Sequence, residues 1–162
     1  MNPGLRIRRR LATLAILELV NVPLQAVIWF GMAGVPPTST NIIGFSLVAG
    51  LLIVGAGYWT IKLIQIKRSM HRFPARPQFA SIRTAAKYLL AGGLLFVALR
   101  VWKEPGLGTL PGLGFVIFAI LEYINYFCWQ LMYDTRPDLR RLFTHGFRHS
   151  HLALDLSTRE VV

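Results

Sequence analysis

The sequence predicts an all-α, polytopic integral membrane protein, a bundle of four transmembrane helices followed by a short amphipathic C-terminal helix. Hydrophobic residues make up 54% of the 162-residue chain, and charged residues only 15%. The apolar residues lie in runs of about 20, the length that a helix needs to cross the hydrocarbon core of a bilayer. The basic residues, which give a net charge of +11, gather between these runs. Together these observations predict a membrane bundle rather than a soluble domain.

The positions of the charges also predict topology and partners. Sixteen of the 18 Lys and Arg residues lie in residues 6–10, in residues 62–87 and in the tail after Asp134. Basic clusters that alternate with apolar runs are typical of cytoplasmic loops. We therefore expect both termini in the cytoplasm of a bacterial cell, with the protein in its plasma membrane. Anionic lipid headgroups are the expected partners of the basic segments, and nucleic acid is not.

The first predicted span, residues 11–33, follows a basic N-terminus at residues 1–10. This beginning is similar to a secretory signal peptide, in which a basic stretch precedes an apolar one. However, the apolar stretch continues past Pro23 and contains Glu18, both of which are unusual for a signal. We therefore expect a retained helix, which ends at the helix-breaking stretch GVPPTSTN.

The second predicted span, residues 42–64, is rich in glycine. Ser46 and Gly50 form a pair of small residues four apart, and Gly57 follows them. Small residues at this spacing let helices approach closely. The spacing predicts close packing within the bundle or against a partner chain.

A basic loop with the two prolines of FPARPQ leads to the third span, residues 85–102. The stretch PGLGTLPGLG then predicts a turn before the fourth span, residues 113–133. These spans define a transmembrane domain at residues 11–133 and a basic cytoplasmic tail at residues 134–162. In the tail, a capping residue, a proline in the first turn and interleaved apolar and Arg residues predict an interfacial helix. From Leu152 onward we expect a loose chain.

Two of the predicted spans contain nearly the same seven residues, AILELVN at 15–21 and AILEYIN at 119–125. Each copy has a glutamate and an asparagine three positions apart, on one face of a helix. A carboxylate inside a bilayer is unfavourable unless it is protonated, paired or hydrated. Because the two helices run in opposite directions, the sequence predicts one polar centre near the bilayer midplane, made by Glu18, Asn21, Gln25, Glu122 and Asn125.

Several further polar residues flank this predicted centre. Tyr126, Trp129 and Tyr133 lie on or beside the face that carries Glu122. Arg100, near the outer end of the third span, can reach toward Glu122, although Glu104 four residues later is the simpler partner.

The sequence implies no cofactor, and metal binding has only a weak candidate. His145 and His149 are four residues apart and His151 follows, but a helical pair needs a third ligand, and Arg148 beside them disfavours a cation. Cys128 lies in an apolar run and, as the only cysteine, can form no intramolecular disulfide.

With four spans and a glutamate in the first, the architecture resembles that of small multidrug-resistance transporters. The resemblance implies a transport role for Glu18. The chain departs from that family in its long basic loop, its tail and its charge bias. The bias favours one fixed orientation, whereas the family works as antiparallel dimers.

Three classes of function fit these features. The first is an accessory or structural subunit, packed with another membrane protein or with itself, in which the polar residues join helices. The second is a small proton- or cation-coupled transporter that uses Glu18 and Glu122. The third is a membrane-embedded enzyme that modifies lipids, although no catalytic motif favours an enzyme.

Overall fold

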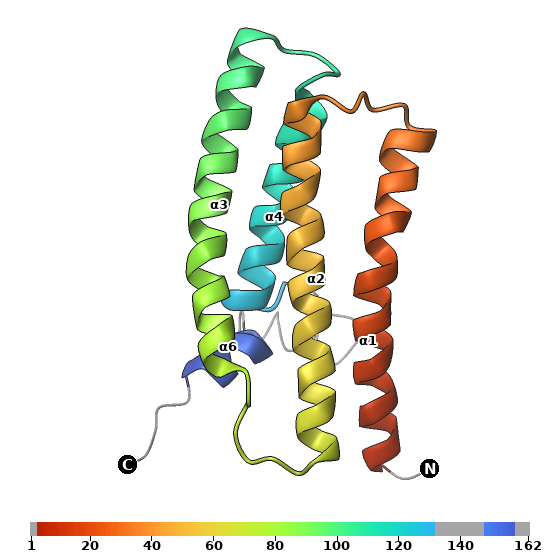
Figure 1. Ribbon diagram of the computed structural model, residues 1–162, viewed down its shortest axis with the longest axis vertical. Coiled ribbons are helices and arrows are strands. Elements are labelled where there is room, and N and C mark those ends of the chain that lie inside the picture. Colours follow the sequence, from red (N-terminus) through yellow and green to blue (C-terminus); the bar gives the residue numbers. More distant parts are fainter. Residues whose placement is uncertain (1–2, 132–147, 158–162) are drawn as a thin grey trace.

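The computed structural model describes residues 3–131 and 148–157, and within them the fold is all-α, as predicted. Each long helical segment is long and apolar enough to cross a membrane. The chain is therefore an integral membrane protein with four candidate spans (Figure 1). These are α1 (Pro3–Ala26) with its π-helical continuation η1 (Val27–Met32), α2 (Ser39–Lys67), α3 (Arg76–Lys103) and α4 (Leu110–Phe127).

The helices run alternately up and down, with α1 and α3 on opposite sides of the bundle in Figure 1. Helix α2 packs against both α1 and α4, and α3 packs chiefly on α4. The start of α1, the loop at 68–75 and the C-terminal helix α6 (His151–Ser157) lie toward one end, which we call the basic end. We call the opposite end, where α2 and α4 begin, the Asn41 end.

Capping residues and prolines set the helix starts. Thr38 has an extended backbone (φ −73°, ψ 161°), and its hydroxyl accepts a hydrogen bond from the Asn41 N–H at 3.3 Å, which begins α2. Pro77 and Pro111 lie in the first turns of α3 and α4, where a missing N–H leaves no helical hydrogen bond unmade.

The first span changes its helical type after Pro23. Proline has no N–H to offer the carbonyl one turn earlier, so the regular ladder of α1 is interrupted there. From Val27 the segment is π-helical, and it ends with the Ala33 N–H on the Ile28 carbonyl at 2.8 Å, five residues back. Such wide turns are rare in helices.

The C-terminal part of the chain differs from the sequence prediction. Helix α4 ends at Phe127 rather than at 133, and Trp129 forms an isolated antiparallel bridge with His149. The expectation of a loose chain is wrong for residues 152–157, because α6 packs on α3 and α4 and leaves Leu152 only 1% exposed, and the residues after Ser157 lie outside the described part. Most of the predicted interfacial helix lies outside the described residues.

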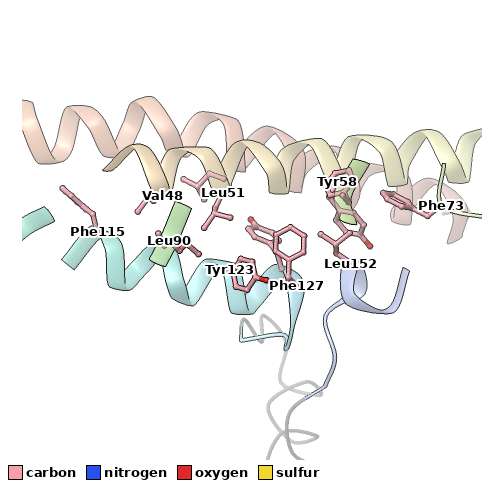
Figure 2. Packing of buried hydrophobic residues seen from close by; sticks show 13 residues of the cluster. Val48, Leu51, Tyr58, Phe73, Leu90, Phe115, Tyr123, Phe127 and Leu152 are labelled. Atoms are coloured by element: carbon pink, nitrogen blue, oxygen red, sulfur yellow. The ribbon is translucent and has the colours of Figure 1, made fainter. Parts of the chain in front are cut away.

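A continuous apolar core joins the helices along their length (Figure 2). At one end Phe115 and Val48 lie between α4 and α2, and at the basic end Tyr58 and Phe73 meet Leu152 of α6. Many large apolar side chains of α1 and α3 face outward, as expected of surfaces that contact lipid, among them Ile16, Leu17, Leu89, Leu95 and Leu99.

Candidate functional site

A cavity of about 460 Å³ lies in the basic half of the bundle. It is bounded by α1, α2, the end of α4 and the segment 148–152, so its wall combines both ends of the chain. Its volume falls within the range of sites that bind small molecules. The lining mixes apolar and polar side chains, namely Ile7, Arg10, Leu11, Leu14, Glu18, Tyr58, Trp59, Lys62, Ile66, Asn125, Tyr126, Gln130, Arg148, Ser150, His151 and Leu152.

Glu18 and Tyr126 form the deepest polar contact of the cavity along α1. The Tyr126 hydroxyl donates a short hydrogen bond to Glu18 Oε1. Tyr126 is buried, and its ring lies over Gly55 of α2, where a Cβ atom would overlap the phenol oxygen. A glycine at this position therefore lets the tyrosine of α4 reach the carboxyl of α1 across α2.

The second glutamate lies beside this pair. Glu122 and Glu18 are close enough for their charges to interact. Asn125, which lines the cavity, donates to Glu122 Oε2 at a long 3.5 Å and accepts from the Leu131 N–H at 2.9 Å. Within residues 3–131 and 148–157, neither glutamate forms an ion pair with a cation. The site thus brings two carboxyl groups together without a compensating positive charge.

The centre lies nearer the basic end than the sequence predicted. Glu18 is at the middle of the first span, Gly4–Met32. Because α4 ends at Phe127, Glu122 is five residues from the end of its helix, about 8 Å at 1.5 Å per residue. With the predicted end of the fourth span at residue 133, this distance would be about 17 Å. Glu18 lines the cavity from the middle of its span, whereas Glu122 is not among the lining residues.

Positive side chains surround the outer part of the cavity. Arg10 and Arg148 are exposed, and no hydrogen bond or ion pair of their guanidinium groups occurs among the described residues. Lys62 is instead bound to Asp155 of α6, with Nζ 2.7 Å from Oδ2. Because only Lys62 is paired, the two arginines are the cations of the described lining that a ligand can bind.

His151 also faces this positive region. Its ring lies edge-on to Trp59 with centroids 6.2 Å apart. Loss of water around the ring, and then the charge of Arg148, lower the pKa of His151 below its ordinary value of 6.5, against the opposing effect of Asp155. Lys62 and Arg10 lower the pKa further. These surroundings favour the neutral form of the imidazole.

The C-terminal segment is fixed to the bundle by polar contacts. Ser150 donates a short hydrogen bond to the Tyr126 carbonyl and caps α6 by accepting from the Ala153 N–H at 3.1 Å. Tyr58 donates to Asp155 Oδ2 at 2.8 Å. Arg76 reaches the Leu156 carbonyl at 3.0 Å. These contacts make the segment part of the cavity wall.

The structure brings together some of the predicted polar residues and separates others. Glu18, Glu122, Asn125 and Tyr126 lie together. Gln25 lies outside this group, because its Oε1 accepts a hydrogen bond at 2.8 Å from the indole of Trp29 in the same span.

Asn21 is half-buried and makes no side-chain hydrogen bond to another described residue. Arg100 lies beside Glu104, at 4.0 Å, with both side chains exposed, and not toward Glu122. Trp129 lies beyond α4 and does not line the cavity. Tyr133 is outside the described residues.

The glycines that make close contacts are not those that the sequence singled out. Gly44 and Gly55 lie so close to α4 that a Cβ would overlap it. Gly50 and Gly57 have no atom within 4 Å of such a Cβ, and Ser46 is exposed. The small-residue face of Ser46, Gly50 and Gly57 therefore does not pack within this bundle.

The histidines of the tail form no metal site among the described residues, since no group of three potential ligands is found there. His149 Nδ1 lies 3.4 Å from the Cys128 carbonyl. His145 is outside the described residues.

Sequence reasoning gave no role in this site to the groups that position it, namely Tyr58, Lys62, Ser150 and Asp155. One signal was present. Tyr58 and Lys62 are four residues apart on one helical face, which is the spacing needed to hold a single acid between them. The sequence does not identify that acid as Asp155.

Comparisons with protein-family models, with curated protein sequences and with solved structures found no match to the chain.

Proposed function

We propose that the protein is a small proton-coupled membrane transporter whose proton site is the pair Glu18 and Glu122. The observations that support this are two carboxyls, from α1 and α4, near enough for their charges to interact, one of them lining a cavity, without a cationic partner among the described residues. Two close carboxylates repel each other, so a shared proton stabilises the pair. Ionisable groups in transmembrane segments commonly mark proton relays.

A proton fits this site better than a metal cation. A metal ion that enters from the basic end must pass Arg10 and Arg148, whose charges oppose it. A proton can instead move by exchange between water and hydrogen-bonded groups. Tyr126 is placed to serve this exchange, because its hydroxyl is bonded to Glu18 and lines the cavity.

The orientation belongs to the same proposal. The basic residues at the start of α1 and in the loop at 68–75 gather toward the basic end. Arg148 lines the same cavity as Arg10 of α1. By the positive-inside rule this end faces the cytoplasm of a bacterial plasma membrane. The cavity then opens toward the cytoplasm.

The test is proton movement in proteoliposomes that contain a pH-sensitive dye and are subjected to a pH gradient. We expect Glu18→Gln and Glu122→Gln to reduce the proton flux toward that of empty liposomes. Glu104→Gln is the matched control, because Glu104 is exposed at the far end of α3. A folded Glu18→Gln protein with the flux of the wild type would contradict the proposal.

An accessory subunit is the second candidate, and one observation favours it. Gly50 and Gly57 present an open face of α2 that nothing in the described bundle fills. A second helix can approach such a face closely. Gly50→Leu should then release a partner that co-purifies in mild detergent, whereas Gly92→Leu, at an equally open position on α3, should not.

A further inference from the structure

The outer part of the cavity combines two features that one ligand can satisfy together. Arg10 and Arg148 lie far apart in the sequence, yet both line the cavity, as does His151. An arginine presents a planar fork of N–H donors that matches the oxygens of a phosphate group. With Lys62 held by Asp155, these two guanidinium groups are the available anion ligands of the described lining.

The wall next to the arginines is apolar. Ile7, Leu11 and Leu14 follow one another at helical spacing on α1, and Ile66 lines the cavity from α2. From Arg10 to Glu18 this wall extends about 12 Å along the helix, at 1.5 Å per residue. A phosphate alone leaves these side chains uncovered, whereas a ligand with a hydrocarbon chain covers them.

The size and place of the cavity narrow the ligand further. About 460 Å³ suits a headgroup with the first part of a chain better than a whole two-chain lipid. Arg10 lies in the first half of α1, and Arg148 lines the same cavity. Phosphate headgroups of the bilayer are abundant at that depth.

We propose that this cavity binds a phosphate-bearing amphiphile, with its phosphate between Arg10 and Arg148 and its hydrocarbon chain against Leu11 and Leu14. The proposal does not depend on the proton site, because neither arginine contacts Glu18 or Glu122 through an ion pair. Loss of proton flux in Glu18→Gln therefore leaves this site intact, and loss of the amphiphile leaves the carboxyl pair intact.

The test is native mass spectrometry of the full chain in a maltoside detergent, titrated with dodecyl phosphate. We expect the double variant Arg10→Gln with Arg148→Gln to weaken binding by about tenfold or more, because each loses a hydrogen bond to a charged group. The matched control, Arg9→Gln with Arg68→Gln, removes the same charge from exposed positions outside the cavity and should change binding less than about twofold.

Two further probes separate the sources of the phosphate. Dodecanol tests the chain without the phosphate, and inorganic phosphate tests the phosphate without the chain. If dodecyl phosphate binds strongly and the other two probes do not, the site is assigned to a lipid-like ligand. Equal binding of inorganic phosphate would assign the site to a soluble phosphate compound and overturn the role of the apolar wall. Equal loss of binding in the cavity and control variants would overturn the site itself.

A second pair of variants tests the cavity without removing charge. Leu14→Trp places a larger side chain in the cavity, whereas Leu17→Trp, on the exposed face of α1, does not. We expect only Leu14→Trp to displace dodecyl phosphate. Unchanged binding in a folded Leu14→Trp protein would contradict a ligand chain at this wall.

Discussion

The two ends of the bundle differ in whether their polar side chains inside the membrane have partners. At the Asn41 end, Asn41 is fully buried, donates to the Pro36 and Leu107 carbonyls and accepts from the Gly112 N–H. Its polar side-chain atoms all have backbone partners, and Gly44 contacts Gly112 directly. At the basic end, two carboxyls and two arginines line or adjoin a cavity without ionic partners among the described residues.

The two ends are therefore expected to have different roles, one in stability and the other in binding. A satisfied polar group in a tightly packed place stabilises the fold and offers little to a ligand. Polar groups around a cavity are available for binding, at some loss of packing. Substitutions at the Asn41 end should therefore affect stability most, and those at the basic end should affect binding and local order.

The largest effect is expected for Asn41→Ala. The change leaves two carbonyls and one N–H without their partner in a buried place, which costs about 3 kcal/mol or more of unfolding free energy. Thermal unfolding in detergent, followed by circular dichroism, measures the loss. Asn21→Ala is the matched control and should change little, because the Asn21 side chain bonds to no other described residue. Equal losses in both variants would remove the contrast between the ends.

Gly55→Ala should have the next largest effect. The added methyl group overlaps the Tyr126 ring and displaces its hydroxyl from Glu18, at about 1–3 kcal/mol for overpacking. Gly57→Ala adds the same group in open space and should be tolerated. In a Tyr126→Ala background the cost of Gly55→Ala should largely vanish. If Gly55→Ala destabilises the Tyr126→Ala protein as much as the wild type, overlap with Tyr126 is not the cause of the destabilisation.

Asp155→Asn should act locally and more weakly. It breaks the ion pair with Lys62 and weakens the bond from Tyr58, a contribution of about 1 kcal/mol for a partly exposed pair. Amide hydrogen exchange in residues 151–157 should become faster while α2 stays protected. Glu104→Gln, which disturbs an exposed pair at 4.0 Å, should leave both regions unchanged. Faster exchange throughout the bundle would contradict a local role.

The smallest effect is expected from pH. The pKa of His151 is lowered in the folded protein, so the unfolded chain binds a proton more readily. The stability of this end is therefore complete above pH 6.5 and decreases as the pH falls toward the folded pKa. Relative to the intrinsic rate at each pH, exchange of the amides of α6 should become faster in that range in the wild type and not in His151→Gln. The same acceleration in both proteins would assign the effect to another group.

The sequence was sufficient for the four spans, because span length and apolar composition follow directly from bilayer thickness. Since polar groups in apolar helices are conspicuous, it also predicted that Glu18, Glu122 and Asn125 lie near one another with Tyr126 beside them, and in the structure they do. It did not identify the packing face of α2. That helix is apolar nearly all round, so periodicity cannot distinguish Gly44 and Gly55 from Gly50.

The C-terminal contribution to the cavity was also beyond sequence reasoning. Ser150 and Asp155 lie in a short segment whose helix depends on tertiary contacts with Tyr126, Tyr58 and Lys62. Isolated helices of this length are unstable in water. Nothing local in the sequence therefore predicts α6, and only the arrangement of distant residues explains it.

The most direct test of the central claim is infrared difference spectroscopy of the carboxyl groups as the pH of the reconstituted protein is changed. A shared proton predicts a carbonyl band of a protonated carboxylic acid in the wild type at about pH 6–7, where exposed carboxyls such as Glu104 are ionised. This band should be lost or shifted in Glu18→Gln and Glu122→Gln and unchanged in Glu104→Gln. A wild-type protein with both carboxylates ionised at about pH 6–7, where ordinary exposed carboxyls are ionised as well, would contradict a shared proton. A band unchanged by either substitution would also contradict it.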